Sequence, residues 1–357
     1  MRLFQKLRRK GSSAASSGSS NYAYVTARVR AMKSNLLPKE TYPRLINMDL
    51  DEITRFIEET QYKQDVDELA RKFKGVDLIE HALNRNLAVT FSKLIDISEG
   101  ELNYLITEYL KNYDIWDIKT ILRGKYYNAP LEEIKDNLVS AGQFKYNFLS
   151  ELAEKESYEH VIDALSNTDY YPILKNYDGT NLPEIENQLD KLYYQRLFDA
   201  IGTPKSSDRK LFSKLIRTEI DIKNIKTMFR MKKEGVEDGE LEDLVLDGGL
   251  RLSLKEINKM VPLPFADFIN SLEKYPYWEA MSDLVNPDME SLVDLETSLT
   301  KYSIKSAASF SHEYPLSIVP IMDYMISKKN EVNNLRIIIR GKAVNLDDEI
   351  IRNQLVI

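Results

Sequence analysis

Apolar residues recur along this chain at helical spacing, and no segment alternates apolar and polar residues as a β-strand would. In the first third, one face of a predicted helix carries four apolar residues, Ile115, Ile118, Ile121 and Leu122. The pattern predicts one long helix in each third of the chain, at about residues 99–127, 208–234 and 316–342. Gly235 follows the second of these, where a glycine commonly ends a helix.

Short amphipathic helices are expected before each long helix. In the first third they lie at about residues 39–48 and 50–59, with Asp49 and Asp51 as N-cap candidates. Each third is predicted to follow the same order, a pair of short helices and then one long helix. The chain is therefore predicted to be all-α.

The chain also repeats itself. Three segments align without gaps, residues 113–125, 220–232 and 330–342. Their shared arginines, Arg123, Arg230 and Arg340, are separated by 107 and 110 positions. Upstream, three amphipathic stretches end in tyrosines separated by 108 and 107 positions, Tyr62, Tyr170 and Tyr277. Two independent landmarks with matching offsets indicate a three-fold internal repeat.

The offsets divide the chain into a basic and Ser-rich extension, residues 1–20, and three helical repeats, residues 21–138, 139–245 and 246–357. Each repeat is expected to have its own small core. Repeats of this size can form a linear stack or close around an axis. We expect closure into a funnel-like structure with pseudo-three-fold symmetry, because such concave shapes commonly grip partners.

An acidic residue recurs nine positions before each repeated arginine, as Asp114, Asp221 and Glu331. These residues fall on or beside the apolar face of the predicted helices, where an unpaired carboxylate would be costly. The favoured interpretation is structural, with each carboxylate paired to a cation or to backbone amides of neighbouring helices. The alternative is a ring of ligands around the pseudo-three-fold axis.

Basic residues recur at the ends of the long helices. The arginines are followed two positions later by lysines, Lys125, Lys232 and Lys342. The helix dipole alone favours cations at this end. If the three helix ends converge, however, these six side chains would form a basic rim that binds acidic partner surfaces.

Composition excludes several classes of function. The chain has no cysteine, which removes disulfides, thiolate metal sites and Cys nucleophiles. The formal net charge of −7 argues against nucleic-acid binding. The RGK segments at residues 123–125 and 340–342 lack the other residues of a phosphate-binding loop, and His81, His160 and His312 occupy non-equivalent positions. We expect no catalytic site, no cofactor, no metal and no small-molecule substrate.

The first twenty residues differ from the rest. Residues 1–10 carry five basic side chains and no acid, and residues 11–20 are mostly Ser, Ala and Gly. No apolar core follows the basic start, so a signal peptide is not expected. The extension is predicted to be a disordered solubilising tail, with a weak electrostatic tether to an anionic membrane as the alternative.

These features carry a family resemblance. The segments NYAYVTARVRAMKSNLLPKETYPRL at residues 21–45, FIEETQY at 56–62 and VDLIEHAL at 76–83, together with the repeated acid–Arg–Lys pattern, resemble the C subunits of archaeal A-type ATP synthases. That family is related to the d subunits of vacuolar-type ATPases. The resemblance implies a helical, funnel-like subunit without an active site. It also implies a position on the cytoplasmic end of the membrane rotor ring, with the foot of the central stalk in a central cavity.

The sequence therefore predicts a non-catalytic central-stalk subunit of a rotary A/V-type ATP synthase. It would act as a socket that couples the stalk to the rotor ring, during ATP synthesis or hydrolysis driven by protons or sodium ions. Its expected location is peripheral, at the cytoplasmic face of the cell membrane. Two other interpretations stay open at this point: a helical-repeat scaffold for soluble partners, and an enzyme with an unrecognised site.

Overall fold

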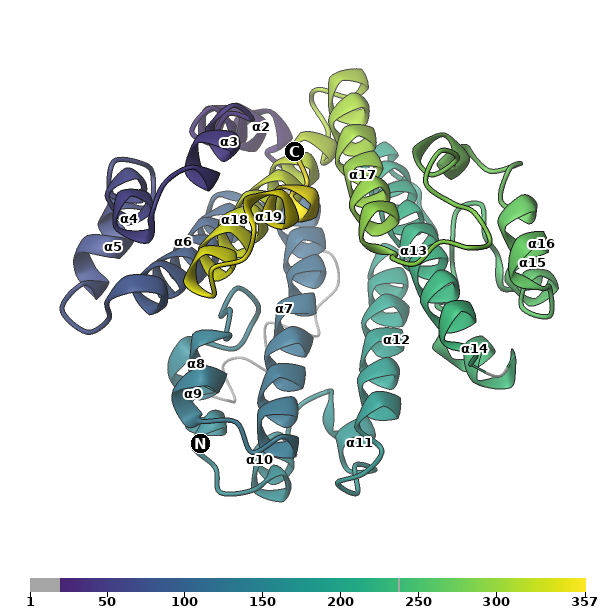
Figure 1. Ribbon diagram of the computed structural model, residues 1–357, viewed down its shortest axis with the longest axis horizontal. Helices are drawn as coiled ribbons and strands as arrows, with labels where there is room; N and C mark the ends of the chain where they lie inside the picture. The colour runs from purple at the N-terminus through teal and green to yellow at the C-terminus, as the bar shows by residue number, and fades with distance from the viewer. Residues whose placement is uncertain (1–19, 237) are drawn as a thin grey trace.

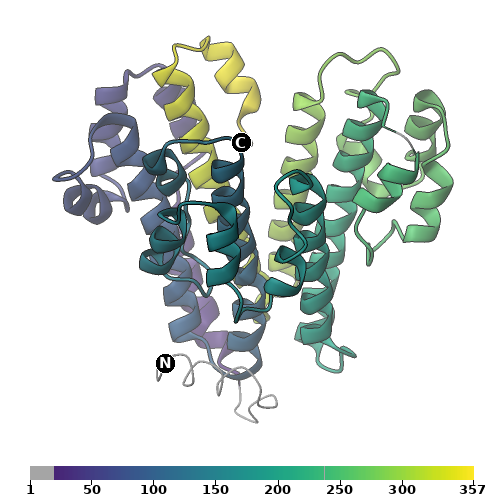
Figure 2. The same ribbon diagram turned by 90° about the horizontal axis from the view of Figure 1, so that it is seen from below.

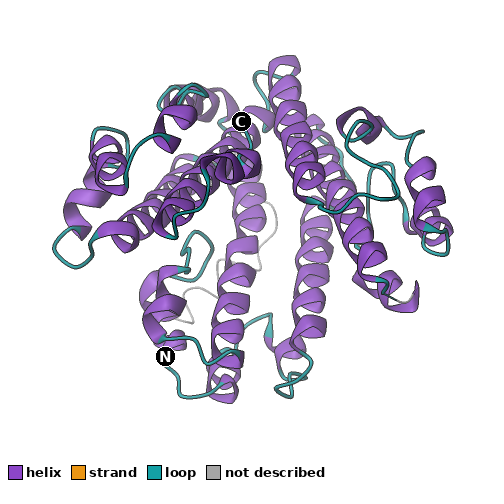
Figure 3. Ribbon diagram, in the orientation of Figure 1, coloured by secondary structure: helices purple, strands orange, loops and turns teal. Residues whose placement is uncertain are grey.

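The computed structural model describes residues 20–236 and 238–357. This part of the chain forms eighteen α-helices and one short 3-10 helix, η1 (Pro276–Ala280), and contains no strand (Figures 1 and 3). The prediction of an all-α fold is confirmed. The predicted role of the extension at residues 1–20 falls almost wholly outside the described residues.

Three long helices lie where the hydrophobic pattern predicts them: α7 (Gly100–Tyr126), α13 (Ser207–Glu234) and α18 (Val319–Ala343). The expectation of a single long helix per repeat is wrong. A second long helix precedes each of the three, namely α6 (Gly75–Ile97), α12 (Leu182–Ile201) and α17 (Val293–Glu313). Buried polar residues interrupt the apolar face of α6, among them Glu80, His81 and Asn84, which weakens its pattern in the sequence.

Short helices connect and cover the long ones. In the first part of the chain these are α2 (Tyr22–Lys33), α3 (Thr41–Ile46), α4 (Leu50–Glu58), α5 (Lys63–Leu69), α8 (Leu131–Asp136), α9 (Tyr146–Ala153), α10 (Tyr158–Ala164) and α11 (Tyr171–Leu174). In the remainder they are α14 (Asp238–Leu244), α15 (Leu254–Met260), α16 (Phe265–Ser271) and α19 (Asp348–Gln354). Asp49 caps α4 in a capping box with Glu52, as predicted, whereas Asp51 lies inside the first turn.

Consecutive long helices pack on each other, most extensively α17 on α18, and three further pairs join long helices of different predicted repeats. Helix α7 lies against α12, α13 against α17, and α18 against α6 (Figures 1 and 2). The last of these pairs brings the two ends of the described chain together, because α18 also packs on α2, α3 and α4. In Figure 1 the purple N-terminal helices accordingly lie beside the yellow C-terminal ones.

The core is divided into two clusters rather than the three expected. One contains the buried side chains of α13 from Ile222 onward, of α15 and α16, and of the first half of α17. The other joins most of the remaining helices, from Val25 to Leu355. The equivalent residues Ile118, Ile225 and Leu335 have no exposed surface. Neither cluster coincides with a predicted repeat, because the larger one combines the first repeat with parts of the second and third, and the smaller one spans the end of the second and the start of the third.

The three long helices end in the same way. Gly235 takes the left-handed conformation after α13, as predicted, and asparagines do so after α7 and α18. Asn128 and Asn345 have φ of 53° and 54°, a region that asparagine tolerates better than other non-glycine residues. In the part of the chain that the structure describes, no helix is long and apolar enough to cross a membrane.

Candidate functional site

The three repeated carboxylates are buried, and each accepts a hydrogen bond from one of the three repeated tyrosines. The exposed fractions of Asp114, Asp221 and Glu331 are 0%, 0% and 2%. The tyrosine hydroxyls donate over 3.3 Å from Tyr170 to Asp114, over 2.5 Å from Tyr277 to Asp221 and over 2.5 Å from Tyr62 to Glu331. The two sequence landmarks thus meet in space.

Each pair joins two predicted repeats. Asp114 and Asp221 take the tyrosine that follows them in the chain by 56 positions, in the next repeat. Glu331, in the last repeat, takes Tyr62 from the first, 269 positions back. The three hydrogen bonds therefore link the helical segments in a closed circuit.

Backbone amides complete the coordination of each carboxylate. Asp114 accepts from the amide of Phe144 over 3.0 Å, and Asp221 accepts from Arg251 over 2.7 Å and Leu252 over 3.1 Å. The segments that supply these amides approach closely because they contain glycine. A Cβ atom on Gly142 would lie 2.1 Å from Oδ1 of Asp114, and one on Gly249 would lie 2.1 Å from Oδ1 of Asp221.

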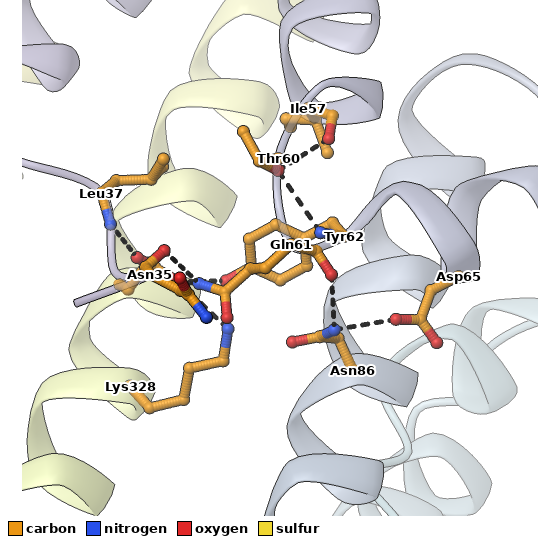
Figure 4. A network of polar contacts seen from close by, with 10 residues as sticks. Asn35, Leu37, Ile57, Thr60, Gln61, Tyr62, Asp65, Asn86 and Lys328 are labelled. Atoms are coloured by element: carbon orange, nitrogen blue, oxygen red, sulfur yellow. Dashed lines mark hydrogen bonds and ion pairs between the residues drawn. The ribbon is translucent and has the colours of Figure 1, made fainter. Parts of the chain in front are cut away.

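The Glu331 site differs from the other two because it contains a cation. Lys328, which has no exposed surface, donates to Oε1 of Glu331 over 3.0 Å and to the Tyr62 hydroxyl over 2.9 Å (Figure 4). Gln61 and the amide of Leu37 donate to the same carboxylate over 2.9 Å and 2.5 Å. Burial lowers the pKa of Lys328, and the neighbouring Glu331 carboxylate opposes this shift.

Burial raises the pKa values of the other two carboxylates, which have no cation in contact. Burial raises the pKa of Asp114 to about 6, although its hydrogen bonds from Phe144 and Tyr170 act in the opposite direction. Burial also raises the pKa of Asp221. The three carboxylates do not converge on one point, since each has its own tyrosine. Among residues 20–236 and 238–357, no group of His, Asp or Glu is arranged to hold a metal ion.

The repeated arginines form ion pairs within the chain. Arg123 binds Glu186 at the start of α12, Arg230 binds Glu296 at the start of α17, and Arg340 binds Glu80 near the start of α6. About half of each arginine side chain stays exposed, at 54%, 53% and 49%. These pairs join the same helices as the packing of the long helices does. The arginines therefore hold neighbouring helices together and still present part of their surface to solvent.

The repeated lysines bind the short helices that follow. Lys125 donates to the carbonyl of Ala153, the last residue of α9, over 2.6 Å. Lys232 donates to the carbonyls of Val261, which ends α15, and Leu263, over 2.6 and 2.7 Å. A cation at the carbonyl end of a helix is favoured by the helix dipole. Lys342 instead pairs with Asp348 at the start of α19, over 2.7 Å.

The chain is similar in sequence to known proteins. A sequence model of the family described as "ATP synthase (C/AC39) subunit" matches residues 25–354. The chain is 71% identical to the C subunit of the A-type ATP synthase of Methanococcoides burtonii, over all of both chains. It is 58% identical to the same protein of Methanosarcina mazei, over 95% of this chain and 94% of the relative. It is 38% identical to that of Archaeoglobus fulgidus, over 94% and 96%.

The chain belongs to the ATP synthase (C/AC39) subunit family.

As a member of the ATP synthase (C/AC39) subunit family, the chain is an accessory subunit of an ATP synthase and not the catalytic one. The resemblance found in the sequence is thereby confirmed. The repeated polar residues therefore belong to an accessory subunit of a larger complex and not to a catalytic subunit.

One further set of polar residues recurs in the aligned repeats of this family member, but no role is predicted for it from the sequence. Three residues after each repeated carboxylate lies a buried amide or carboxyl group, Asp117, Asn224 or Asn334. Each accepts a hydrogen bond from a backbone amide 22 positions later, at Val139, Leu246 and Val356, over 2.7 to 3.0 Å. The aligned repeats contain this signal, because an Asp or Asn occupies the same position in all three.

Proposed function

We propose that this chain is the central-stalk subunit of its ATP synthase that joins the stalk to the membrane rotor ring. In this proposal it is a non-catalytic socket during proton- or sodium-driven synthesis or hydrolysis of ATP. It is a peripheral protein at the cytoplasmic face of the cell membrane, and its partners are the rotor ring and the other central-stalk subunits. Family membership supports the assignment to the complex, and the geometry supports the coupling role.

The observation that carries the coupling role is the closed circuit of carboxylate–tyrosine pairs. Because Glu331 binds Tyr62, the last long helix is fixed to the first short helices. A closed frame transmits torque better than an open row of helices, since no free edge can slide. We therefore propose the funnel-like, pseudo-three-fold arrangement of repeats at residues 21–138, 139–245 and 246–357 as the basis of the socket.

The six basic residues at the helix ends are part of the proposal as partner-binding residues: Arg123, Lys125, Arg230, Lys232, Arg340 and Lys342. Exchanging the two charges of an ion pair separates the role of these residues in partner binding from their role in the stability of the fold. Arg123→Glu combined with Glu186→Arg keeps an opposite-charge pair between α7 and α12 but reverses the sign of the exposed end. Assembly should weaken while the melting temperature changes little. Unchanged assembly would remove Arg123 from the partner surface.

Imaging of the intact complex tests the whole proposal. A tagged copy of this subunit is expected to co-purify with the rotor ring and the central stalk from detergent-extracted membranes, and to lie between them in a reconstruction. A subunit that lies on the periphery of the complex, or that never co-purifies with it, would contradict the proposal and favour a soluble scaffold.

A further inference from the structure

A second line of equivalent positions runs along α7, α13 and α18. The residue types at these positions differ between the three helices. The positions two residues before the buried carboxylates hold Asn112 in α7, Glu219 in α13 and Lys329 in α18. One turn later the equivalent positions hold Trp116, Lys223 and Asn333, all three exposed. Residues that hold a repeated frame together are expected to recur in each copy. A single bound partner has no three-fold symmetry, so the residues that differ between copies are the better candidates for recognising it.

Side chains from these positions meet where four long helices come together. The Nζ atom of Lys329 in α18 lies 5.9 Å from the ring centroid of Tyr113 in α7. The Nζ atom of Lys223 in α13 lies 4.9 Å from the ring centroid of Tyr194 in α12, and the Tyr194 hydroxyl donates to Oε1 of Glu219 over 2.7 Å. Lys329 is also electrostatically coupled to both Glu219 and Lys223. These residues therefore form one group, which we call the axial lysine cluster: Tyr113, Tyr194, Glu219, Lys223 and Lys329.

The axial lysine cluster carries excess positive charge. Neither Lys223 nor Lys329 has a carboxylate oxygen within ion-pair distance in the described residues, unlike Arg123, Arg230 and Arg340. Glu219 accepts its hydrogen bonds from tyrosines instead of cations. Lys226, one turn along α13 from Lys223, bonds to the hydroxyl of Thr300, and its nearest compensating charge is Glu296, which Arg230 already binds.

The helices around Lys329 partly desolvate its ammonium group. This desolvation lowers the pKa of Lys329, although the side chain keeps exposed surface. A carboxylate of a bound partner close to Lys329 would compensate the ammonium.

We propose that Lys223 and Lys329 form a carboxylate-binding site for an acidic segment of the central stalk. This inference rests on the proposed function, because it specifies the chemistry of the stalk segment that the socket receives. Charge complementarity selects an acidic segment, and the absence of three-fold repetition in the cluster fixes the rotational position at which the stalk is held. The carboxylates of the stalk would contact α13 and α18 rather than all three repeats equally.

The test measures binding of the full-length subunit to the purified central-stalk subunits of the same ATP synthase, by biolayer interferometry at low and physiological salt. The double variant Lys223→Gln/Lys329→Gln should bind at least about tenfold more weakly than the wild type at low salt, and the salt dependence of its affinity should be smaller. Lys305→Gln is the matched control, since Lys305 is an exposed lysine of α17 outside the cluster. It should bind as the wild type does.

Three outcomes are informative. If the wild type binds the stalk and the double variant binds equally well, the axial lysine cluster is not the site and the inference fails, while the proposed function stands. If the wild type does not bind the stalk at all, the proposed function fails.

A separate experiment titrates the isolated subunit with inorganic phosphate and follows its melting temperature. Stabilisation that the double variant lacks would indicate a site for free anions and overturn the assignment to a protein carboxylate.

The lysine substitutions are not expected to unfold the protein, because both side chains are solvent-accessible. Circular dichroism melting of each variant checks this. Lys329→Arg provides a second measurement of stalk affinity, because this variant keeps the positive charge. It should retain most of the affinity if charge is the determinant, and a loss as large as that of Lys329→Gln would contradict the proposal.

Discussion

The hydroxyl of Tyr62 donates a hydrogen bond to Oε1 of Glu331 over 2.5 Å, although 269 positions separate the two residues. The same contact joins Tyr170 to Asp114 and Tyr277 to Asp221. In all three cases the carboxylate comes from a long helix and the tyrosine from the segment at the end of a short amphipathic helix. The stability of the frame should therefore depend on three chemically similar pairs that can be tested separately.

Removing one hydroxyl at a time tests these pairs. Tyr62→Phe, Tyr170→Phe and Tyr277→Phe should each lower the free energy of unfolding by about 1.5–3 kcal/mol, because each leaves a buried carboxylate with one donor fewer. Urea unfolding at pH 7 measures the change. Tyr24→Phe is the control, since Tyr24 is 54% exposed, and it should be close to neutral. A neutral result for Tyr62→Phe would mean that its hydrogen bond to Glu331 is not needed.

The cation at the Glu331 site makes this carboxylate the most costly to neutralise. Glu331→Gln should destabilise the protein by about 3–5 kcal/mol, because it leaves the Lys328 ammonium buried without a counter-charge. Asp221→Asn should cost less, because no ammonium contacts Asp221. Adding Lys328→Met to Glu331→Gln should recover part of the loss. Equal costs for Glu331→Gln and Asp221→Asn in urea unfolding would contradict this account.

Asp114 should make stability depend on pH in a direction opposite to that of most carboxylates. Burial raises its pKa from 3.8 to about 6, so the folded protein binds this proton more tightly than the unfolded chain does. Its contribution is therefore fully present below pH 3.8 and is lost as the pH rises through about 6. Between pH 4.5 and 7 the wild type should lose about 2 kcal/mol relative to Asp114→Asn.

The measurement is the difference in unfolding free energy between wild type and Asp114→Asn at each pH, which cancels the titration of other groups. Asp243→Asn, at an exposed position in α14, serves as the control, and the pH dependence for Asp114→Asn should exceed that of the control. A pH-independent difference for Asp114→Asn would show that the buried carboxyl group does not change its protonation in this range.

The glycines beside the carboxylates should not tolerate a side chain. Gly142→Ala and Gly249→Ala would each place a methyl group 2.1 Å from a carboxylate oxygen, so either the loop or the carboxylate must move. We expect a loss of at least about 2 kcal/mol in each case, as overpacking usually costs. Gly239→Ala is the control. It lies in α14 with no atom within 4 Å of the added methyl, and it should be neutral or slightly stabilising.

The sequence shows which residues occupy equivalent positions in the three repeats, but it does not show which of these residues contact each other. Matching offsets identify the three carboxylates and the three tyrosines as repeated, but they do not say that Glu331 reaches back to Tyr62, because periodicity contains no information on which segments pack together. The second long helices were missed for a related reason. The charge of Glu80 interrupts the apolar pattern of α6, and it is accommodated because Arg336 and Arg340, from the far end of the chain, pair with it. The position of a buried charged residue such as Glu80 can be explained only when the residue that pairs with it is known.

The packing of α18 on the N-terminal helices also has a consequence for biosynthesis. Tyr62, Ile53 and Ile57 leave the ribosome early, but the helix that covers them is made only near the end of translation. Until then these apolar side chains remain available to chaperones and proteases. A chain that terminates before residue 319 would lack the surface of α18 on which α4 packs, so quality control could recognise an incomplete subunit before it reaches the complex.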